Sequence, residues 1–278
     1  MRPQIVDREV TLHILKTFHL HADKKLGQNF LISPSVLSAI VEAAGLSPAE
    51  TVLEVGPGIG TLTQGLAETG CQVVAVELDK RLLPVLGKTL EGYDNVRIVH
   101  GDVLKLDLVQ TVGAPRFQLV ANLPYYITTP IILKMLEERL PVDRLVTMVQ
   151  LEVAQRMVAP PGGKDYGALS VAVQYYSEPH IVREVTPDCF YPAPAVTSAV
   201  IRCDIRREPP VDICDERLFF RIVKAAFGQR RKTLNNALKA AGNPDVAAWL
   251  IRAGIDGNRR GETLSLDEFA ALTNAFAG

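Results

Sequence analysis

The chain has 278 residues, of which 47% are hydrophobic and 22% are charged, and its formal net charge is −1. This composition is typical of a soluble globular protein, and no apolar run approaches the roughly 18 residues that a membrane-spanning helix needs. The 4 cysteines form no C-x-x-C pair and the 5 histidines form no H-x-x-x-H, so the sequence predicts neither a disulfide framework nor a metal site. We expect a cytoplasmic protein without membrane association, because the N-terminus lacks the continuous apolar segment of a secretory signal.

Residues 51–205 alternate short β-rich runs with helical patterns, which is typical of βαβ units and a mainly parallel sheet. The connection between the last two predicted strands is too short for a crossover helix, so the sheet should end in an antiparallel pair. The predicted strands are 51–55, 72–77, 96–100, 117–121, 144–150, 180–185 and 196–204.

The β signal disappears after residue 206, and apolar residues then recur at helical spacing. We therefore predict two domains, an α/β domain of residues 1–206 and a smaller helical domain of residues 207–278. Between Leu218 and Pro244 the second domain carries basic side chains and no acidic residue. Such a run is either a solvated helix face or a surface for phosphates. The basic residues are Arg221, Lys224, Arg230, Arg231, Lys232 and Lys239.

A glycine-rich loop follows the first predicted strand, with Gly56, Gly58 and Gly60 at alternate positions. Glycines let the backbone turn sharply and approach a ligand closely. The spacing departs from the dinucleotide fingerprint, because Thr61 stands where that motif needs glycine or alanine. Glu54, just before the loop, would repel a pyrophosphate but would tolerate a cationic ligand.

Acidic residues follow the next two predicted strands. Glu77 ends the second strand and could accept hydrogen bonds from both ribose hydroxyls of a nucleoside, and Asp102 follows the third strand and could accept from an adenine amino group. Helix capping is the alternative role for such acids, and it fits Asp79 in particular. Because the ends of successive parallel strands converge on one crevice, the glycine loop and the acids together predict a nucleoside-cofactor site.

The fourth strand ends in Ala121-Asn122-Leu123-Pro124-Tyr125-Tyr126. Asparagine and proline are ordinary turn residues, so a plain strand end is one interpretation. In company with the other motifs, however, the chain resembles the ribosomal RNA adenine dimethyltransferases, the KsgA or RsmA family, over nearly its whole length. The resemblance rests on residues 26–31, the glycine loop, Glu77, Gly101-Asp102, residues 122–125, residues 190–198 and residues 226–234.

The resemblance implies a Rossmann-like class I methyltransferase sheet, mainly parallel with an antiparallel strand at one edge, and an all-helical C-terminal domain. It implies that residues 1–206 bind S-adenosylmethionine and catalyse N6,N6-dimethylation of two adjacent adenosines, in a hairpin loop near the 3′ end of 16S rRNA. The partner would be an immature small (30S) ribosomal subunit, in small-subunit biogenesis, and we expect a monomer. The implied cofactor-binding residues are Asn29, Leu31, Gly56, Gly58, Glu77, Asp102 and Asn122.

The Asn-Leu-Pro-Tyr segment gains a chemical explanation from this resemblance. Adenine N6 is a poor nucleophile, so acceptors aimed at its N–H bonds should stabilise the more positive nitrogen of the transition state. Related Asn-Pro-Pro-Tyr enzymes use the asparagine oxygen and the next carbonyl, here Asn122 Oδ1 and the Leu123 carbonyl. Pro124 would fix that carbonyl, Tyr125 would stack on the adenine, and the resemblance places Phe190 on the opposite face. The predicted RNA-binding residues are Arg221, Lys224, Arg230, Arg231 and Lys232.

Three alternatives remain open on the sequence. An erythromycin-resistance methyltransferase would perform the same chemistry on large-subunit RNA, although the Leu123 position and the long helical tail favour the first interpretation. A non-catalytic assembly or transcription factor could keep the fold as a nucleic-acid-binding module, but the intact Glu77 and Asn122–Tyr125 argue against lost catalysis. An NAD-dependent oxidoreductase fits poorly with the glycine spacing and with the lack of an acid/base histidine near the strand ends.

Overall fold

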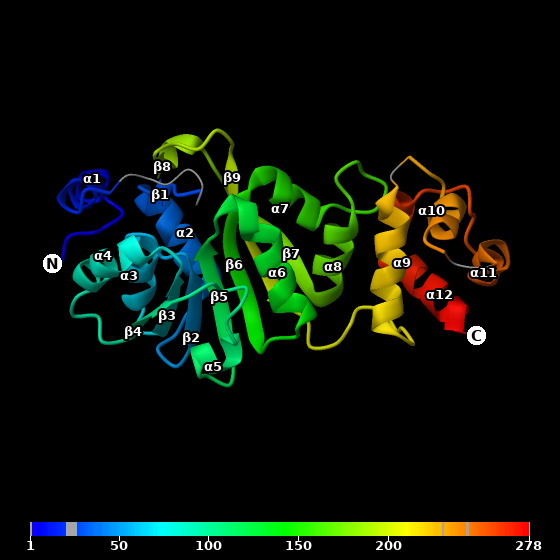
Figure 1. The fold of residues 1–278 in the computed structure, drawn as a ribbon, viewed down its shortest axis with the longest axis horizontal. Coiled ribbons are helices and arrows are strands. Elements are labelled where there is room, and N and C mark those ends of the chain that lie inside the picture. Colours follow the sequence, from blue (N-terminus) through cyan, green and yellow to red (C-terminus); the bar gives the residue numbers. More distant parts are fainter. Residues whose placement is uncertain (1, 21–26, 230, 243–244, 278) are drawn as a thin grey trace. The chain divides into compact units, whose positions relative to one another are not determined.

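The computed structural model describes residues 2–20, 27–229, 231–242 and 245–277 (Figure 1). The chain divides into two compact units, which we call unit 1 (residues 1–154 and 180–205) and unit 2 (residues 155–179 and 206–278). Residues 155–179 were predicted to be part of the first domain, 1–206, but they lie in unit 2. They belong there because the rings of Tyr175 and Tyr176 contact Phe219 and Phe220 of that unit.

A seven-stranded sheet forms the centre of unit 1, with the strand order β4-β3-β2-β5-β6-β9-β7. The five strands from β4 to β6 in that order are mutually parallel, and β9 is antiparallel to β6. The antiparallel strand thus lies next to the edge strand β7. The strands are β2 (Thr51–Val55), β3 (Gln72–Glu77), β4 (Val96–His100), β5 (Phe117–Asn122), β6 (Val142–Gln150), β7 (Ser177–Val185) and β9 (Ser198–Ile205).

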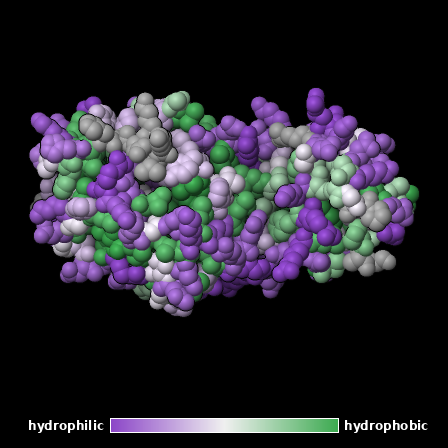
Figure 2. All heavy atoms as spheres, viewed as in Figure 1, coloured by the Kyte–Doolittle hydropathy of each residue, from purple (hydrophilic) through white to green (hydrophobic). Residues whose placement is uncertain are grey.

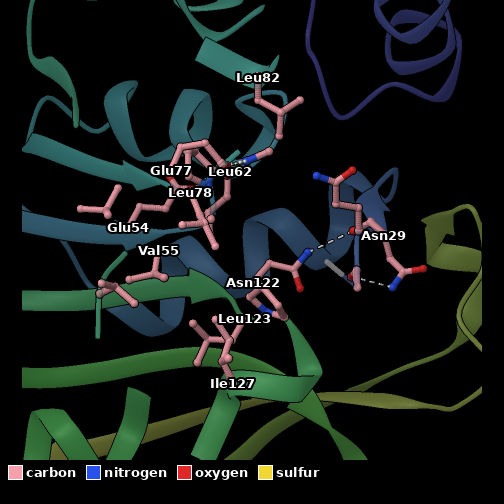
Figure 3. A pocket seen from close by; sticks show the side chains of 18 of the residues that line it. Asn29, Glu54, Val55, Leu62, Glu77, Leu78, Leu82, Asn122, Leu123 and Ile127 are labelled. Carbon is pink, nitrogen blue, oxygen red and sulfur yellow. Dashed lines mark hydrogen bonds between the residues drawn. The ribbon is translucent and has the colours of Figure 1, made fainter. Parts of the chain in front are cut away.

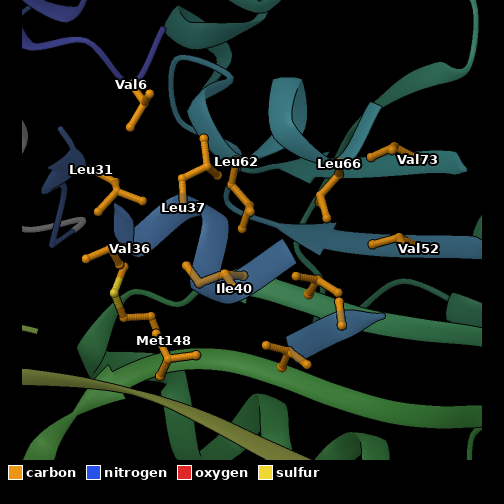
Figure 4. Close-up of a cluster of buried hydrophobic side chains, with 14 of the residues drawn as sticks. Val6, Leu31, Val36, Leu37, Ile40, Val52, Leu62, Leu66, Val73 and Met148 are labelled. Carbon is orange, nitrogen blue, oxygen red and sulfur yellow. The ribbon is translucent and has the colours of Figure 1, made fainter. Parts of the chain in front are cut away.

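One face of this sheet is covered by α2 (Pro34–Ala44) and α3 (Thr61–Ala67), as Figure 4 shows. Alternate residues of a strand point to the same face, so one valine from each of several strands enters the shared hydrophobic cluster. Burial of apolar area at about 25 cal/mol per Å² makes such a cluster the main stabilising term of the fold. The cluster includes Val36, Leu37, Ile40, Val52, Leu62, Leu66, Val73, Val120, Val146 and Val200.

A second hydrophobic cluster joins the N-terminal residues to the neighbourhood of the glycine loop. It contains Ile14 and Leu15 of α1 (Arg8–Thr17), Leu86 of α4 (Leu83–Thr89), and also Phe30 and Ile59. The remaining elements of unit 1 are η2 (Lys80–Leu82), α5 (Leu108–Val112), η3 (Tyr125–Ile127), α6 (Thr128–Glu137) and η4 (Pro187–Cys189), and α7 (Leu151–Val158) continues from unit 1 into unit 2.

A separate two-stranded sheet links two distant segments of unit 1. It pairs β1 (Phe30–Leu31) with β8 (Phe190–Tyr191) in antiparallel register, Phe30 opposite Tyr191 and Leu31 opposite Phe190. The Ile32 amide extends the pairing by donating to the Cys189 carbonyl at 2.8 Å. Leu31, expected to bind the cofactor, and Phe190, expected to face the target base, therefore stand opposite each other in a hydrogen-bonded pair of strands.

Unit 2 is helical and is built around α9 (Glu216–Gly228), which contacts α8 (Ala168–Tyr176), α10 (Leu234–Ala240) and α12 (Leu266–Ala277). α11 (Val246–Arg252) contacts α12, and η5 (Gly261–Thr263) contacts α9. Glu216 accepts hydrogen bonds from the phenols of Tyr175 and Tyr176, which gives these largely buried hydroxyls a partner. Within the described ranges, no helix combines the length and the apolar character that crossing a membrane requires.

Candidate active site

A pocket opens in unit 1 where the carboxyl ends of β2, β3 and β5 meet the segments that follow them (Figure 3). This is the crevice that parallel sheets use for ligands, since their loops converge at one edge. Most of the predicted cofactor and base-contacting residues lie in its wall. They are Asn29, Leu31, Gly56, Gly58, Glu77, Asp102, Asn122, Leu123, Pro124 and Tyr125.

The glycine loop needs glycine because of its backbone conformation. Gly56 and Gly58 have φ angles of 70° and 61°, a left-handed conformation that L side chains rarely adopt. A Cβ at Gly58 would stand 3.4 Å from the ring of Phe30, and one at Gly56 would stand 3.7 Å from Pro124. The loop backbone therefore forms the pocket wall directly, in contact with both the β1 segment and the segment after β5.

Glu77 is 5% exposed at the end of β3, and its carboxylate is held from two sides. Oε1 accepts from the Asp79 amide at 2.7 Å, and Oε2 accepts from the Gly58 amide at 3.3 Å. Burial raises the pKa of Glu77, and these two amides oppose the rise. Asp79 is the capping acid, as predicted, because its Oδ1 accepts from the Arg81 amide at the start of η2.

Glu54 indicates whether the pocket favours a positively or a negatively charged ligand. It is 1% exposed and lines the pocket, yet Oε2 has no hydrogen-bond partner in the described part of the chain. Burial raises its pKa to about 8, the Glu77 carboxylate adds to the rise, and the nearby Thr63 hydroxyl opposes it without reaching hydrogen-bond geometry. An orphaned buried carboxylate is costly unless a donor or a cation meets it. The wall therefore fits a nucleoside ligand that carries positive charge, such as S-adenosylmethionine, and disfavours a pyrophosphate.

Asp102 lies in the pocket wall after β4, at the position predicted for an adenine contact. Its Oδ1 accepts from the Leu104 amide at 3.0 Å, which fixes the turn, and its Oδ2 lies 3.3 Å from Lys105 Nζ. The Lys105 side chain is 82% exposed, so this ion pair is weak and a ligand can compete for the oxygen.

The Asn122 side chain, at the last residue of β5, has a defined orientation. Its Nδ2 donates to the Asn29 carbonyl at 3.3 Å, and Asn29 Nδ2 donates in turn to the Gly27 carbonyl at 3.1 Å (Figure 3). This bond places the nitrogen toward β1 and leaves Oδ1 as the acceptor end. No donor in the described ranges bonds Asn122 Oδ1 or the Leu123 carbonyl. The two acceptors predicted for an adenine amino group are thus both available.

The backbone after Asn122 is fixed by its own hydrogen bonds. The Leu123 amide donates to the Met148 carbonyl at 3.2 Å, and the Pro124 carbonyl accepts from the Ile127 amide and from Thr128 Oγ1, each at 3.1 Å. Tyr125 shares a 2.6 Å hydrogen bond with Ser198 Oγ at the start of β9. Burial raises the pKa of Tyr125, so the phenol is neutral at physiological pH.

Phe190 is the predicted site residue that the structure does not bring into this pocket wall. It is 3% exposed and belongs to the hydrophobic cluster beneath α2, whereas its neighbour Tyr191 is 39% exposed. Two-residue pairing with β1 turns Phe190 inward, because successive strand residues point to opposite faces. Sequence reasoning also missed Tyr126, which is 52% exposed and lines the pocket. Its place beside Tyr125 in the quoted motif was the available signal.

The predicted RNA-binding residues lie in unit 2, apart from Arg230, which is outside the described residues. Arg221 and Lys224 are exposed on α9. Arg217, which was not among the predicted residues, is a third exposed cation on the same helix face, because positions 217, 221 and 224 follow the i, i+4, i+7 spacing. These three, with the exposed Arg231 and Lys232, have no ion-pair partner in the described ranges, and we call them the α9 basic stripe. Figure 2 shows strongly hydrophilic residues over this part of unit 2.

The sequence is similar to a known protein family and to named members of it. The family described as "Ribosomal RNA adenine dimethylase" matches residues 19–278. A relative named "Ribosomal RNA small subunit methyltransferase A" from Alkaliphilus metalliredigens is 49% identical over 99% of this chain and 98% of its own. Another of that name, from Geobacillus thermodenitrificans, is 52% identical over 95% of this chain and 94% of its own.

Solved structures agree with these relatives. A dimethyladenosine transferase from Plasmodium falciparum superposes with a TM-score of 0.72 at 25% identity, over 87% of this chain and 95% of that one. The 23S rRNA methyltransferase ErmE superposes with a TM-score of 0.70 at 29% identity, over 90% of this chain and 100% of that one. The predicted class I methyltransferase fold is confirmed. The chain belongs to the ribosomal RNA adenine dimethylase family.

Proposed function

We propose that this protein transfers methyl groups from S-adenosylmethionine to N6 of two adjacent adenosines, in a hairpin loop near the 3′ end of 16S rRNA. It acts as a monomer on an immature 30S subunit in the cytoplasm. The observation that carries this proposal is the orientation of Asn122, whose amide nitrogen is held by Asn29 and whose oxygen is free beside a nucleoside pocket. Identity near 50% to small-subunit enzymes over almost the full length supports the choice of RNA.

The cofactor half of the pocket would be held by residues at the ends of β2, β3 and β4. Glu77 offers carboxylate oxygens to the ribose, Asp102 offers an acceptor to the adenine amino group, and the left-handed glycine loop admits the ligand closely. Glu54 stabilises positive charge on the ligand. When bound, S-adenosylmethionine supplies a methyl group activated by the sulfonium charge.

The residues in the base half of the pocket stabilise the transition state of methyl transfer. Asn122 Oδ1 and the Leu123 carbonyl accept from the two N6–H bonds of the adenine, and they stabilise the nitrogen as positive charge develops on it. Because the amide and the carbonyl are already fixed, this stabilisation requires no reorganisation during transfer. The nitrogen loses its proton readily once it is methylated, so no general base is needed. Tyr125 provides the ring on which the flipped base stacks.

Transfer of labelled methyl from S-adenosylmethionine tests the proposal directly. The substrates are small ribosomal subunits from a strain that lacks this dimethylation, and large subunits are assayed in parallel. Dimethyladenosine on small-subunit RNA supports the proposal. Label on large-subunit RNA contradicts it and favours the activity named for ErmE. No label on either RNA, with S-adenosylmethionine binding intact, favours a non-catalytic binding module.

A further inference from the structure

The Tyr125 ring is fastened at both of its ends. At its backbone end, the Pro124 carbonyl is bonded by the Ile127 amide and by Thr128 Oγ1, so the η3 turn is fixed. At its far end, the phenol oxygen lies 2.6 Å from Ser198 Oγ. An aromatic ring that is held at only one end keeps its torsional freedom, whereas a second anchor defines the plane that the ring presents.

Ser198 is well placed to be that second anchor. It is 0% exposed and opens β9, where it stands opposite Gln150 of β6. The preceding carbonyl, that of Thr197, accepts from the Leu151 amide at 3.0 Å, so both flanks of Ser198 are tied to the sheet. Ser198 is thus held in the hydrogen-bonded ladder of β6 and β9, and its hydroxyl connects that ladder to a ring in the pocket wall.

The bond between Tyr125 and Ser198 fixes the ring as well as giving both hydroxyls a partner. Tyr125 is partly buried in a pocket wall, and its hydroxyl meets a wholly buried serine 73 residues away in the chain. The bond therefore ties the far end of the ring to a strand of the sheet. Stacking depends on the ring plane, since offset-stacked rings attract only over a narrow range of orientations.

We propose that Ser198 is a positioning residue for methyl transfer, whose hydroxyl holds the Tyr125 ring in the plane that stacks on the target adenine. The inference rests on the proposed function, because it takes the adenine as the group that Tyr125 meets. Ser198 touches neither the base nor the cofactor in this role. It acts through Tyr125 alone, and that restriction makes the role testable.

A double-mutant cycle tests the inference. Ser198→Ala and Tyr125→Phe each remove one hydroxyl of the pair, and we expect each to lower kcat by about 3- to 10-fold with a smaller change in KM for the small subunit. The double variant should be no slower than either single variant, because the second change has nothing further to remove. Losses that multiply in the double variant would overturn the proposal.

A matched control separates positioning from stability. Ser177 also opens a strand, is 0% exposed, and donates its hydroxyl to the Val173 carbonyl at 2.8 Å. We expect Ser177→Ala to lower the thermal midpoint about as much as Ser198→Ala while leaving kcat unchanged. An equal fall of kcat in both serine variants would show that Ser198 acts only through stability.

A readout without turnover distinguishes failure of this inference from failure of the proposed function. Fluorotyrosine is incorporated, and the ¹⁹F resonance of Tyr125 is assigned by its loss in Tyr125→Phe. In Ser198→Ala this resonance should shift or broaden, while the other tyrosine resonances and the Kd for S-adenosylhomocysteine stay unchanged. An unchanged Tyr125 resonance overturns the inference even if the enzyme is active. A changed resonance in a protein that methylates neither subunit upholds the anchor and rejects the proposed function.

Discussion

The pocket of unit 1 and the α9 basic stripe of unit 2 handle polar groups in opposite ways. Asn122, Glu77 and Asp102 are each held by a protein hydrogen bond before any ligand arrives. Arg221 and Lys224, in contrast, extend into solvent without a partner in the described part of the chain. Fixed dipoles suit a transition state, whereas mobile cations suit a flexible polyanion and can adapt to its phosphates.

This difference predicts how each region should respond to change. In the pocket, one altered side chain should have a large effect that salt hardly changes, because the surrounding groups cannot rearrange to compensate. On the stripe, single changes should have small effects that depend on ionic strength.

Asn122→Ala is the most severe test of the fixed pocket. Removing one oriented acceptor should lower the rate of methyl transfer by roughly 100- to 1,000-fold, in line with loss of one transition-state partner. Single-turnover assays measure the rate, and calorimetry shows whether the protein still binds S-adenosylhomocysteine. Near-normal turnover in a folded variant would remove Asn122 from the mechanism. Asn258→Ala, at an exposed site in unit 2, serves as the control.

Glu77→Ala should act on the cofactor rather than on the chemistry. Loss of the ribose acceptor should weaken cofactor binding by about 1 to 3 kcal/mol, the range for hydrogen bonds to charged groups. Calorimetric titration measures this change, and kcat at saturating cofactor should fall much less than in Asn122→Ala. An unchanged Kd would contradict the assignment of Glu77.

Glu54 in the pocket should make the stability of the protein depend on pH. Burial raises its pKa from 4.5 to about 8, so between these values the folded protein without ligand binds more protons than the unfolded chain. Its stability should therefore fall as pH rises, by about 2 kcal/mol from about pH 6 to about pH 8. Urea unfolding at both pH values measures this loss.

Glu54→Gln should flatten that pH dependence, because the amide does not ionise. The exposed Glu42→Gln should leave it as in the wild type. The same Glu54→Gln variant should bind S-adenosylmethionine more weakly, because the amide, unlike the carboxyl group, cannot lose a proton when the cation binds. If stability falls equally with pH in both variants, Glu54 is not the group responsible.

Charge reversal on the stripe should have the smallest effect per residue. We expect Arg221→Glu and Lys224→Glu each to weaken RNA binding by about 1 kcal/mol at moderate salt, and to reduce the slope of log K against log salt by about 1 per lost contact. Lys88 is an exposed residue of unit 1, and Lys88→Glu changes the net charge by the same amount. This control should change neither the affinity for RNA nor the salt dependence of binding. If Lys88→Glu weakens binding as much, the stripe is only a solvated helix face.

Much of the fold could be predicted because its signals are local. The apolar runs predicted β2 and β3 to the residue, since a buried parallel strand is a short continuous apolar segment. The edge strand β4 was also predicted to the residue, from its β-branched residues. Glu77 and Asn122 could be placed in one crevice for the same reason, because strand ends in a parallel sheet converge.

The remainder depends on contacts between residues far apart in sequence. A strand of two residues carries no periodicity, so the pairing of β1 with β8 left no pattern, and the burial of Phe190 follows from that pairing. The bond between Tyr125 and Ser198 likewise joins two segments whose spacing in the chain predicts nothing. Arg217 was missed because it stands just before the acid-free run, although helical spacing places it on the same face.

The β1–β8 ladder also has a consequence for motion. Each strand is two residues long, so neither can stay ordered without the other, and the pair should open as a single cooperative unit. In hydrogen exchange, the Ile32 amide, which donates to Cys189, should gain protection together with the paired amides of β8 when ligand binds the pocket. The amides of β1 and those of β8, just before Pro192, would then exchange with solvent at one shared rate.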